Sequence, residues 1–337
     1  MSYHFLLDLS LILLSTKVLG LVTKRFKMPQ VVGALLAGLV LGPAMLNVLT
    51  ETEFITQMAE LGVIILMFTA GLETDIKELK KTGKASFVIA LIGVVVPLIG
   101  GFALTYFFNH PTDGTPDNMV ILQNIFVGVI LTATSVSISV ETLKEMGKLN
   151  TRAGNAILGA AVIDDILGII ALTIITSLAD PTVNIAMVLI KIVAFFILSL
   201  GAGYVFYRLF NKFQARYQKD MRRFVIIAFV FCLFLAYCAE SFFGVADITG
   251  AYIAGVLISN TQRTKYIAAR FDTLSYILLS PIFFASIGLK VSLPSMTGTI
   301  ILFAVLLMVI AVLTKIIGCG LGAKLCHMTN QECLQIG

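Results

Sequence analysis

Two adjacent aspartates in the middle of a membrane-length apolar run constrain this chain more than any other feature. Asp164 and Asp165 are the only ionisable residues between Ala153 and Leu178, and about 20 apolar residues are enough to cross a bilayer. Each charge at the centre of a membrane helix costs about 2.5–3.5 kcal/mol of insertion free energy. A buried acid pair therefore predicts a site for a cation, a proton or both. The alternative is a helix that lines a wet crevice, where water merely solvates the two acids.

The composition favours a membrane protein. The chain has 337 residues, of which 58% are hydrophobic and 13% charged, against about 25% charged residues in soluble domains. The five cysteines lack metal-ligand spacing, and no motif indicates a cofactor or a nucleic-acid partner. The apolar segments predict eleven transmembrane helices, at 4–22, 30–49, 55–73, 86–109, 119–143, 151–178, 183–209, 222–242, 246–260, 271–289 and 298–325.

The basic residues predict how these helices are oriented. Of the 24 Lys and Arg, 20 fall in the connections that follow odd-numbered helices. The positive-inside rule places those connections in the cytoplasm and the N-terminus outside. The net charge of +5 follows from this asymmetry.

The sequence also contains an internal repeat at an offset of 217 residues. Residues 29–38 reappear as 246–255, and residues 70–72 map onto 287–289. The offset is seven helices, an odd number, so the two copies must have opposite membrane orientations, as in transporters with inverted-topology repeats. We therefore expect an all-α polytopic membrane protein with such a repeat. Counterparts of the fifth and sixth helices would follow Gly337, so 11 of an expected 13 helices are predicted in a C-terminally incomplete single domain, 1–337.

The fifth apolar segment is unusually rich in hydroxyl side chains: Thr132, Thr134, Ser135, Ser137 and Ser139. Such side chains compete for backbone hydrogen bonds. In a bilayer, a broken helix is tolerated only where it is buried in protein or lines a cavity. The run predicts an interrupted helix whose free carbonyls and hydroxyls, at Thr132, Thr134 and Ser135 first, bind a cation. An unbroken helix whose hydroxyls bond its own carbonyls is the alternative.

Lys315 lies about 17 residues into the last apolar segment, too deep for an obvious snorkelling position. Asp164 and Asp165 are the only acids at comparable depth. Adjacent helical residues point about 100° apart, so we expect one aspartate to face Lys315 and the other to face the cavity. Neighbouring carboxylates titrate in two coupled steps, which suits a site that holds either a proton or a cation. Glu60 and Lys17, nearer to helix ends, are the next candidates.

Five motifs of the chain form a recognisable set: GALLAGLVLGP at 33–43, FTAGLE at 68–73, TATS at 132–135, AAVIDD at 160–165 and PIFFASIGL at 281–289. This set resembles the second branch of the bacterial monovalent cation:proton antiporters, whose members have the NhaA-type fold and are related to potassium-efflux antiporters. The resemblance implies a homodimer that works by elevator-type alternating access. It also implies dimerisation helices within 1–80 and 222–290, core helices within 85–178 and 298–337, and a linker helix at 183–209.

The resemblance implies roles for individual residues. Asp165 matches the aspartate that carries the ion and the proton, and Asp164 matches a second aspartate paired with the lysine at position 315. The 132–135 segment matches one of two crossing broken helices, the other of which would follow Gly337. Members with this Asp-Asp-Lys set are generally electrogenic.

Three function classes remain open from the sequence. The leading one is a secondary antiporter in the bacterial inner membrane, not an enzyme, that exchanges Na⁺ (or K⁺ or Li⁺) for H⁺. The second is a glutathione- or nucleotide-gated K⁺ efflux antiporter of the same fold, whose cytoplasmic regulatory domain would lie beyond Gly337. The remote third is an intramembrane aspartyl protease, which needs two catalytic acids flanking one water, whereas both acids here share one helix.

Overall fold

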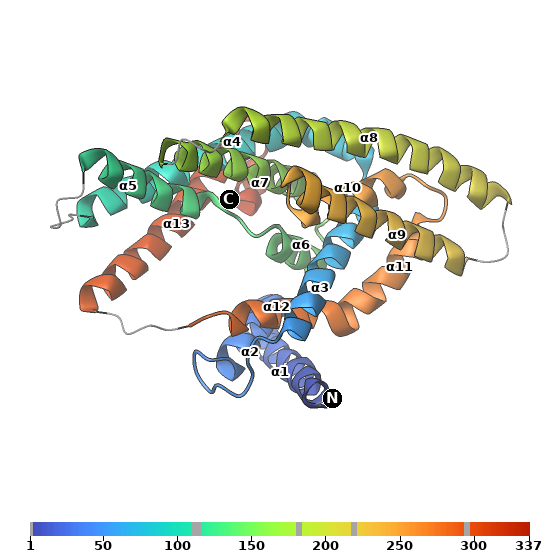
Figure 1. The fold of residues 1–337 in the computed structure, drawn as a ribbon, viewed down its shortest axis with the longest axis horizontal. Helices are drawn as coiled ribbons and strands as arrows, with labels where there is room; N and C mark the ends of the chain where they lie inside the picture. The colour runs from blue at the N-terminus through green and yellow to red at the C-terminus, as the bar shows by residue number, and fades with distance from the viewer. Residues whose placement is uncertain (1–2, 110–115, 180–183, 217–220, 293–296) are drawn as a thin grey trace.

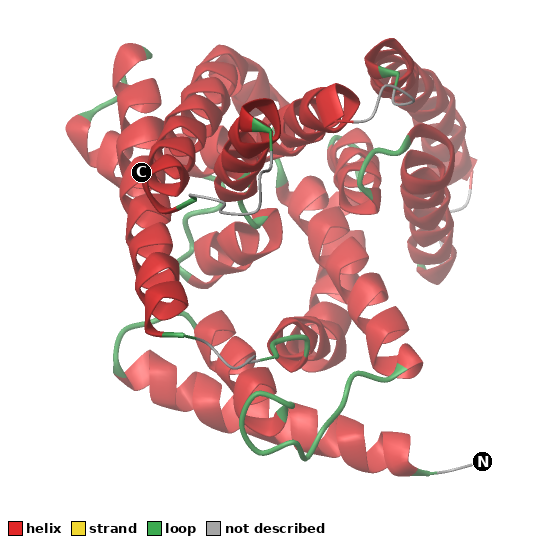
Figure 2. Ribbon diagram, turned by 60° about the vertical axis from the view of Figure 1, so that its left-hand side comes forward, coloured by secondary structure: helices red, strands yellow, loops and turns green. Residues whose placement is uncertain are grey.

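The computed structural model describes residues 3–109, 116–179, 184–216, 221–292 and 297–337. Helices and the loops between them make up this described part, and it contains no strand (Figure 2). Nine of its helices are long and apolar enough to cross a membrane, and two shorter apolar helices have 12 and 13 residues. The chain is therefore an all-helical, polytopic membrane protein. The predicted start at 183 and the predicted loops across 110–115, 180–183, 217–220 and 293–296 lie outside the described residues.

The helices follow in the order shown by the colours of Figure 1. They are α1 (His4–Arg25), α2 (Gln30–Leu41), α3 (Glu53–Glu73), α4 (Ile76–Phe108), α5 (Asp117–Thr132), α6 (Val136–Glu145), α7 (Arg152–Ala179), α8 (Ile185–Arg216), α9 (Arg222–Cys238), η1 (Ala239–Phe243), α10 (Asp247–Ser259), α11 (Thr264–Leu274), η2 (Ser275–Leu279), α12 (Ser280–Leu289), α13 (Gly298–Leu325) and α14 (Asn330–Ile336), where η marks a π-helical segment.

The predicted helix at 30–49 is wrong in its second half. Helix α2 ends at Leu41, and residues 42–52 lead to α3 without regular structure. Pro43 explains the early end, because proline lacks a backbone N–H and disfavours the helical conformation of the residue before it. The apolar residues after Pro43 had extended the prediction.

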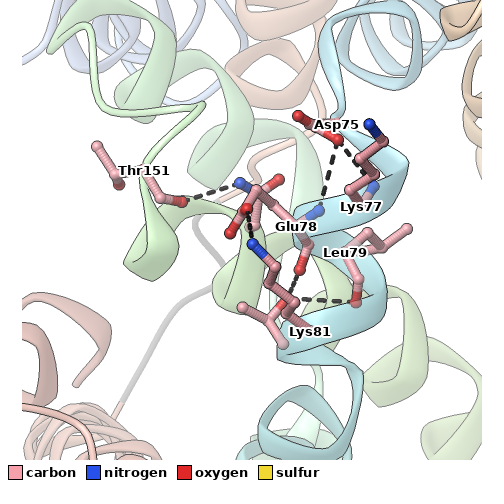
Figure 3. Close-up of polar contacts among 8 residues, drawn as sticks. Asp75, Lys77, Glu78, Leu79, Lys81 and Thr151 are labelled. Carbon is pink, nitrogen blue, oxygen red and sulfur yellow. Dashed lines mark hydrogen bonds and ion pairs between the residues drawn. The ribbon is translucent and has the colours of Figure 1, made fainter.

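Three helices are longer than predicted, because they continue past the apolar run into charged residues. The helix predicted at 271–289 begins at Thr264 and comprises α11, η2 and α12. Helix α4 begins at Ile76 rather than 86, where the Asp75 carboxylate accepts a hydrogen bond from the Lys77 N–H at 2.7 Å and caps the helix (Figure 3). Helix α8 reaches Arg216 rather than 209. Lysine, arginine and glutamate are good helix formers, so a loss of apolar character does not end a helix.

The helices pack in two groups (Figure 1). In the first group α2 packs on α1 and α12, and α3 packs on α10, α11 and α12; the largest apolar core surrounds α3. In the second group α4 packs on α5, α7 and α13, and α14 packs on α7 and α13. Helix α6 contacts α7 of the second group and α2 and α3 of the first. Helix α8 likewise contacts α7 on one side and α9 and α10 on the other, so α6 and α8 connect the two groups.

Glycines let helix backbones touch inside the first group. A Cβ atom at Gly38 of α2 would overlap the carbonyl oxygen of Ala285 in α12, and a Cβ at Gly255 of α10 would overlap that of Phe68 in α3. Small residues at helix contacts permit this approach. The offset of 217 relates Gly38 to Gly255 and Phe68 to Ala285, so the two contacts recur at the offset of the sequence repeat.

Candidate functional site

Helix α7 buries Asp164 inside the second helix group. Ala160 and Ala161, one turn before it, are 7% exposed, as is the Asp164 residue itself. Lys315 of α13 donates a hydrogen bond from Nζ to Asp164 Oδ2 at 3.1 Å, and its side chain is 19% exposed. A buried carboxylate needs such a partner, because moving an ion from water into a protein interior costs on the order of several kcal/mol. The structure thus brings together Lys315 and the first of the two aspartates.

A small cavity lies beside the Asp164 carboxylate. Oδ1 is buried and accepts no hydrogen bond from any residue in the described ranges. The cavity beside Asp164 has a volume of about 90 Å³, more than the roughly 10–15 Å³ that one water needs. It is lined by Ile89, Ala90, Gly93, Thr134, Ser139, Ile157, Ala160, Ala161, Asp164, Lys315, Cys319 and Ile336. A proton or a small cation in this space would satisfy the unpaired oxygen.

The helix predicted to be interrupted is interrupted. Helix α5 ends at Thr132 and α6 begins at Val136, with a non-helical link between them. Ser135 makes the second start possible, because its hydroxyl oxygen accepts a hydrogen bond from the Ile138 N–H at 3.3 Å. The last carbonyls of α5 receive no backbone N–H from a continuing helix. The carboxyl end of a helix also carries partial negative charge, which favours a cation nearby.

The hydroxyl residues of this segment have different partners. Thr134 lines the Asp164 cavity. The Thr132 hydroxyl instead donates to the Val129 carbonyl at 2.7 Å, within α5. Ser139 lines the cavity as well, although it was not among the predicted site residues. Its position one helical turn after Ser135 would have placed it on the same face of α6.

Asp165 occupies the neighbouring face of α7. It is half-buried, and it makes no hydrogen bond or ion pair with a residue of the described ranges. The expectation that one aspartate faces the lysine is confirmed for Asp164. The expectation that the other one faces the cavity differs from the structure, where Asp164, and not Asp165, is among the lining residues. Asp164 pairs with Lys315 through Oδ2, and both residues line the cavity. Of the secondary candidates, Glu60 is exposed on α3 and Lys17 lies over the ring of Tyr276, 3.6 Å from its centroid.

Helix α14 closes one side of the cavity with Ile336. A capping box starts this helix: Glu332 accepts a hydrogen bond from the Thr329 N–H at 2.9 Å, while Thr329 accepts one from the Glu332 N–H. The hydrogen bond from the Thr329 N–H lowers the pKa of the Glu332 carboxyl. Arg152, at the start of α7, lies 3.6 Å from the same carboxylate and ties the two helices together.

A second charged cluster joins the two helix groups at the end of α6. Lys144 forms ion pairs with Asp272 of α11 and with Glu73 of α3, the latter at 3.6 Å. The next residue, Glu145, accepts a hydrogen bond from the Gln30 N–H of α2 at 2.7 Å. A cavity of about 510 Å³ lies beside these residues. Two ion pairs and one hydrogen bond therefore fasten the second half of the interrupted helix to three helices of the first group.

Comparison with known proteins identifies the family. The family described as "Sodium/hydrogen exchanger, transmembrane" matches residues 10–337. The Na⁺/H⁺-K⁺ antiporter GerN of Bacillus cereus is 39% identical over 338 residues, covering 100% of this chain and 84% of that protein. A Na⁺/H⁺ antiporter of Enterococcus hirae is 34% identical over 339 residues, covering 99% and 85%.

A solved structure agrees with this result at the level of the fold. The sodium proton antiporter MjNhaP1 of Methanocaldococcus jannaschii superposes with a TM-score of 0.69 at 19% identity, covering 98% of this chain and 80% of that one. The relatives are transporters, not enzymes. The chain belongs to the transmembrane sodium/hydrogen exchanger family.

Proposed function

We propose that this chain is a secondary antiporter that exchanges Na⁺ for H⁺ across the bacterial inner membrane. The observation that carries the proposal is the buried Asp164–Lys315 pair, which lines a cavity at a helix break together with Thr134. The names of the relatives GerN and the Enterococcus hirae antiporter support Na⁺ as the first candidate. The name of GerN includes K⁺, which makes K⁺ the second candidate, followed by Li⁺.

The charges of the site explain why a cation and a proton would compete for it. Asp164 and Asp165 carry two negative charges against the single positive charge of Lys315, so the empty set has a net charge of −1. One monovalent cation or one proton neutralises it, and a low-dielectric site strongly penalises holding both. In this mechanism Asp165 carries the exchanged ion, and Thr134 supplies a further oxygen ligand.

Lys315 gives the exchange its electrical character. When a cation binds between the two carboxylates, it competes with the ammonium for Asp164, and the ion pair breaks. In this proposal the exchange moves net charge and is electrogenic, as the resemblance implies for the Asp-Asp-Lys set.

Alternating access would follow from the two packing groups. In this proposal the helices within 85–178 and 298–337 form a core that moves against a dimerisation domain formed by 1–80 and 222–290, with the helix at 183–209 as the linker. The glycine contacts that recur at an offset of 217 support the inverted repeat behind this movement. Helices α6 and α8 contact both packing groups, which supports the division into a core and a dimerisation domain joined by connecting helices. The protein would be a homodimer with its N-terminus outside.

Reconstitution into sealed vesicles tests the function. Purified protein should move protons when Na⁺, K⁺ or Li⁺ is added, as followed by a pH-sensitive dye, and an imposed membrane potential should change the rate. Asp164→Asn and Asp165→Asn should each abolish the signal. Asp8→Asn, on α1 and outside the site, should leave it intact. Wild-type protein without cation-dependent proton movement, or exchange that survives both site variants, would overturn the proposal.

A further inference from the structure

A groove of about 500 Å³ lies at the carboxyl end of α8, away from the Asp164 cavity. Its lining combines apolar side chains with two cations: Phe206, Leu209, Phe210, Lys212, Phe213, Arg216 and Ile227. All but Ile227 belong to the last three turns of α8, and Ile227 belongs to α9 (Figure 1). The transport proposal assigns no role to this groove.

Packed aromatic rings form the floor of the groove. The Phe206 ring stacks on Phe231 of α9 with centroids 3.9 Å apart. Phe210 and Phe213 meet Phe224 edge-on, at 5.9 and 5.7 Å. Interlocked aromatic pairs of this kind hold one another in place, so the apolar surface is formed before any ligand arrives.

The two cations at the rim, Lys212 and Arg216, have no partner among the residues that the structure describes. Lys212 and Arg216 are four residues apart, which places them on one face of α8. Both are exposed, and neither forms an ion pair or hydrogen bond with any residue that the structure describes. Nearby arginines differ: Arg208 lies over the Tyr204 ring at 5.1 Å, and Arg263 lies over Phe224 at 4.9 Å. The groove therefore combines apolar surface with two uncompensated positive charges.

The length of α8 places this rim at the lipid headgroups. The helix has 32 residues and is about 48 Å long at 1.5 Å per residue. The hydrocarbon core of a bilayer is about 30 Å thick, so the last turns of α8 reach the headgroup layer. Lysine and arginine at this depth attract anionic lipids, each by roughly fivefold in affinity.

We propose that this groove binds one anionic phospholipid, with an acyl chain against the Phe206, Phe210 and Phe213 rings and the phosphate between Lys212 and Arg216. The charge of the rim and its depth favour this ligand over a second protein chain. Two cations at roughly fivefold each give a preference of roughly 25-fold over a zwitterionic lipid. Binding here would fix the end of the helix that connects the two groups.

The absence of tryptophan from the sequence makes a direct test available. The variant Ile227→Trp places a single fluorophore on the α9 wall of the groove. In bilayers that contain brominated phosphatidylglycerol or brominated phosphatidylcholine, its quenching reports which lipid occupies the groove. We expect a preference of roughly 25-fold for phosphatidylglycerol. Adding Lys212→Gln and Arg216→Gln should reduce this preference to near one.

Matched controls separate a site from general attraction to a basic surface. Arg208→Gln removes a positive charge from the same helix outside the groove and should keep the preference. A tryptophan at Ile197, which is 67% exposed on α8, should show no preference between the lipids. Leu209→Trp is a second reporter if the first variant fails to fold.

Three outcomes would overturn the proposal. Equal quenching by the two lipids would mean that the groove does not select charge. Loss of the preference with Arg208→Gln would mean that the attraction is not local. Absence of quenching by either lipid would mean that protein covers the groove.

Discussion

The variant Lys315→Ala tests the geometry of the site through stability. It leaves the Asp164 carboxylate, in a residue 7% exposed, without its ammonium partner. Removing one member of a buried ion pair costs about 3–5 kcal/mol, whereas an exposed pair contributes about 0–1 kcal/mol. Because the Lys315 side chain is 19% exposed, we expect a loss near the lower limit of the buried range, about 3 kcal/mol.

This free energy converts into a measurable melting shift. An unfolding entropy of about 2.1 cal/mol/K per residue gives about 0.7 kcal/mol/K for a chain of this length. A loss of about 3 kcal/mol then lowers the melting temperature by about 4 °C. Lys290→Ala is the matched control, because Lys290 pairs with Glu51 at 3.3 Å while its side chain is 56% exposed. It should shift the melting temperature by less than about 1.5 °C.

The assay is thermal unfolding of the purified protein in detergent, with a double-mutant cycle through Asp164→Asn. If the pair exists, Lys315→Ala should cost far less when Asp164 is already neutral, and the coupling energy should be about 2–3 kcal/mol. Melting of Lys315→Ala within 1 °C of the control, with a coupling near zero, would refute the reasoning. Lys315 would then extend to the membrane surface without a partner.

Three further outcomes are expected. Asp165→Asn should abolish cation/proton exchange in vesicles while expression and dimerisation stay normal; retained exchange would remove Asp165 from the mechanism. Gly255→Val should lower the melting temperature by about 2–4 °C, because its side chain would overlap the Phe68 carbonyl and overpacking costs about 1–3 kcal/mol, whereas Gly201→Val, which meets nothing within 4 Å, should not. Ser139→Ala should weaken cation affinity severalfold at unchanged stability, as measured by the cation dependence of exchange; an unchanged affinity would show that its hydroxyl is not a ligand.

The sequence predicted the features that depend on local composition. Apolar length revealed most of the helices, and the hydroxyl run around Thr134 predicted the break that the structure contains. The depth of Lys315 indicated that it needs a buried acid. The early end of α2 was missed because Pro43 interrupts an apolar run whose hydropathy continues. Ion pairs such as Lys144 with Asp272 join residues far apart in sequence, and only the tertiary structure brings them together.

The family resemblance assigned Asp164 as the partner of Lys315, and the structure confirms that pair. Helical periodicity separates Asp164 from Asp165 by about 100°, but it does not say which direction α13 approaches from. The packing of α4 against both α7 and α13 decides that Lys315 meets Asp164. Periodicity therefore predicted the chemistry of the pair, the resemblance predicted its partners, and the packing of the helices brings them together.

The glycine contacts of the first helix group have a consequence for biosynthesis. Gly38 meets Ala285, and Gly255 meets Phe68, so each contact joins segments that leave the ribosome far apart in time. At about 5–20 residues per second, the interval between Gly38 and Ala285 is about 10–50 s. Throughout that interval α2, with only 12 residues, has α1 beside it but not α12. Until α12 is inserted, the insertion machinery or lipid must therefore occupy the face of α2 that contains Gly38.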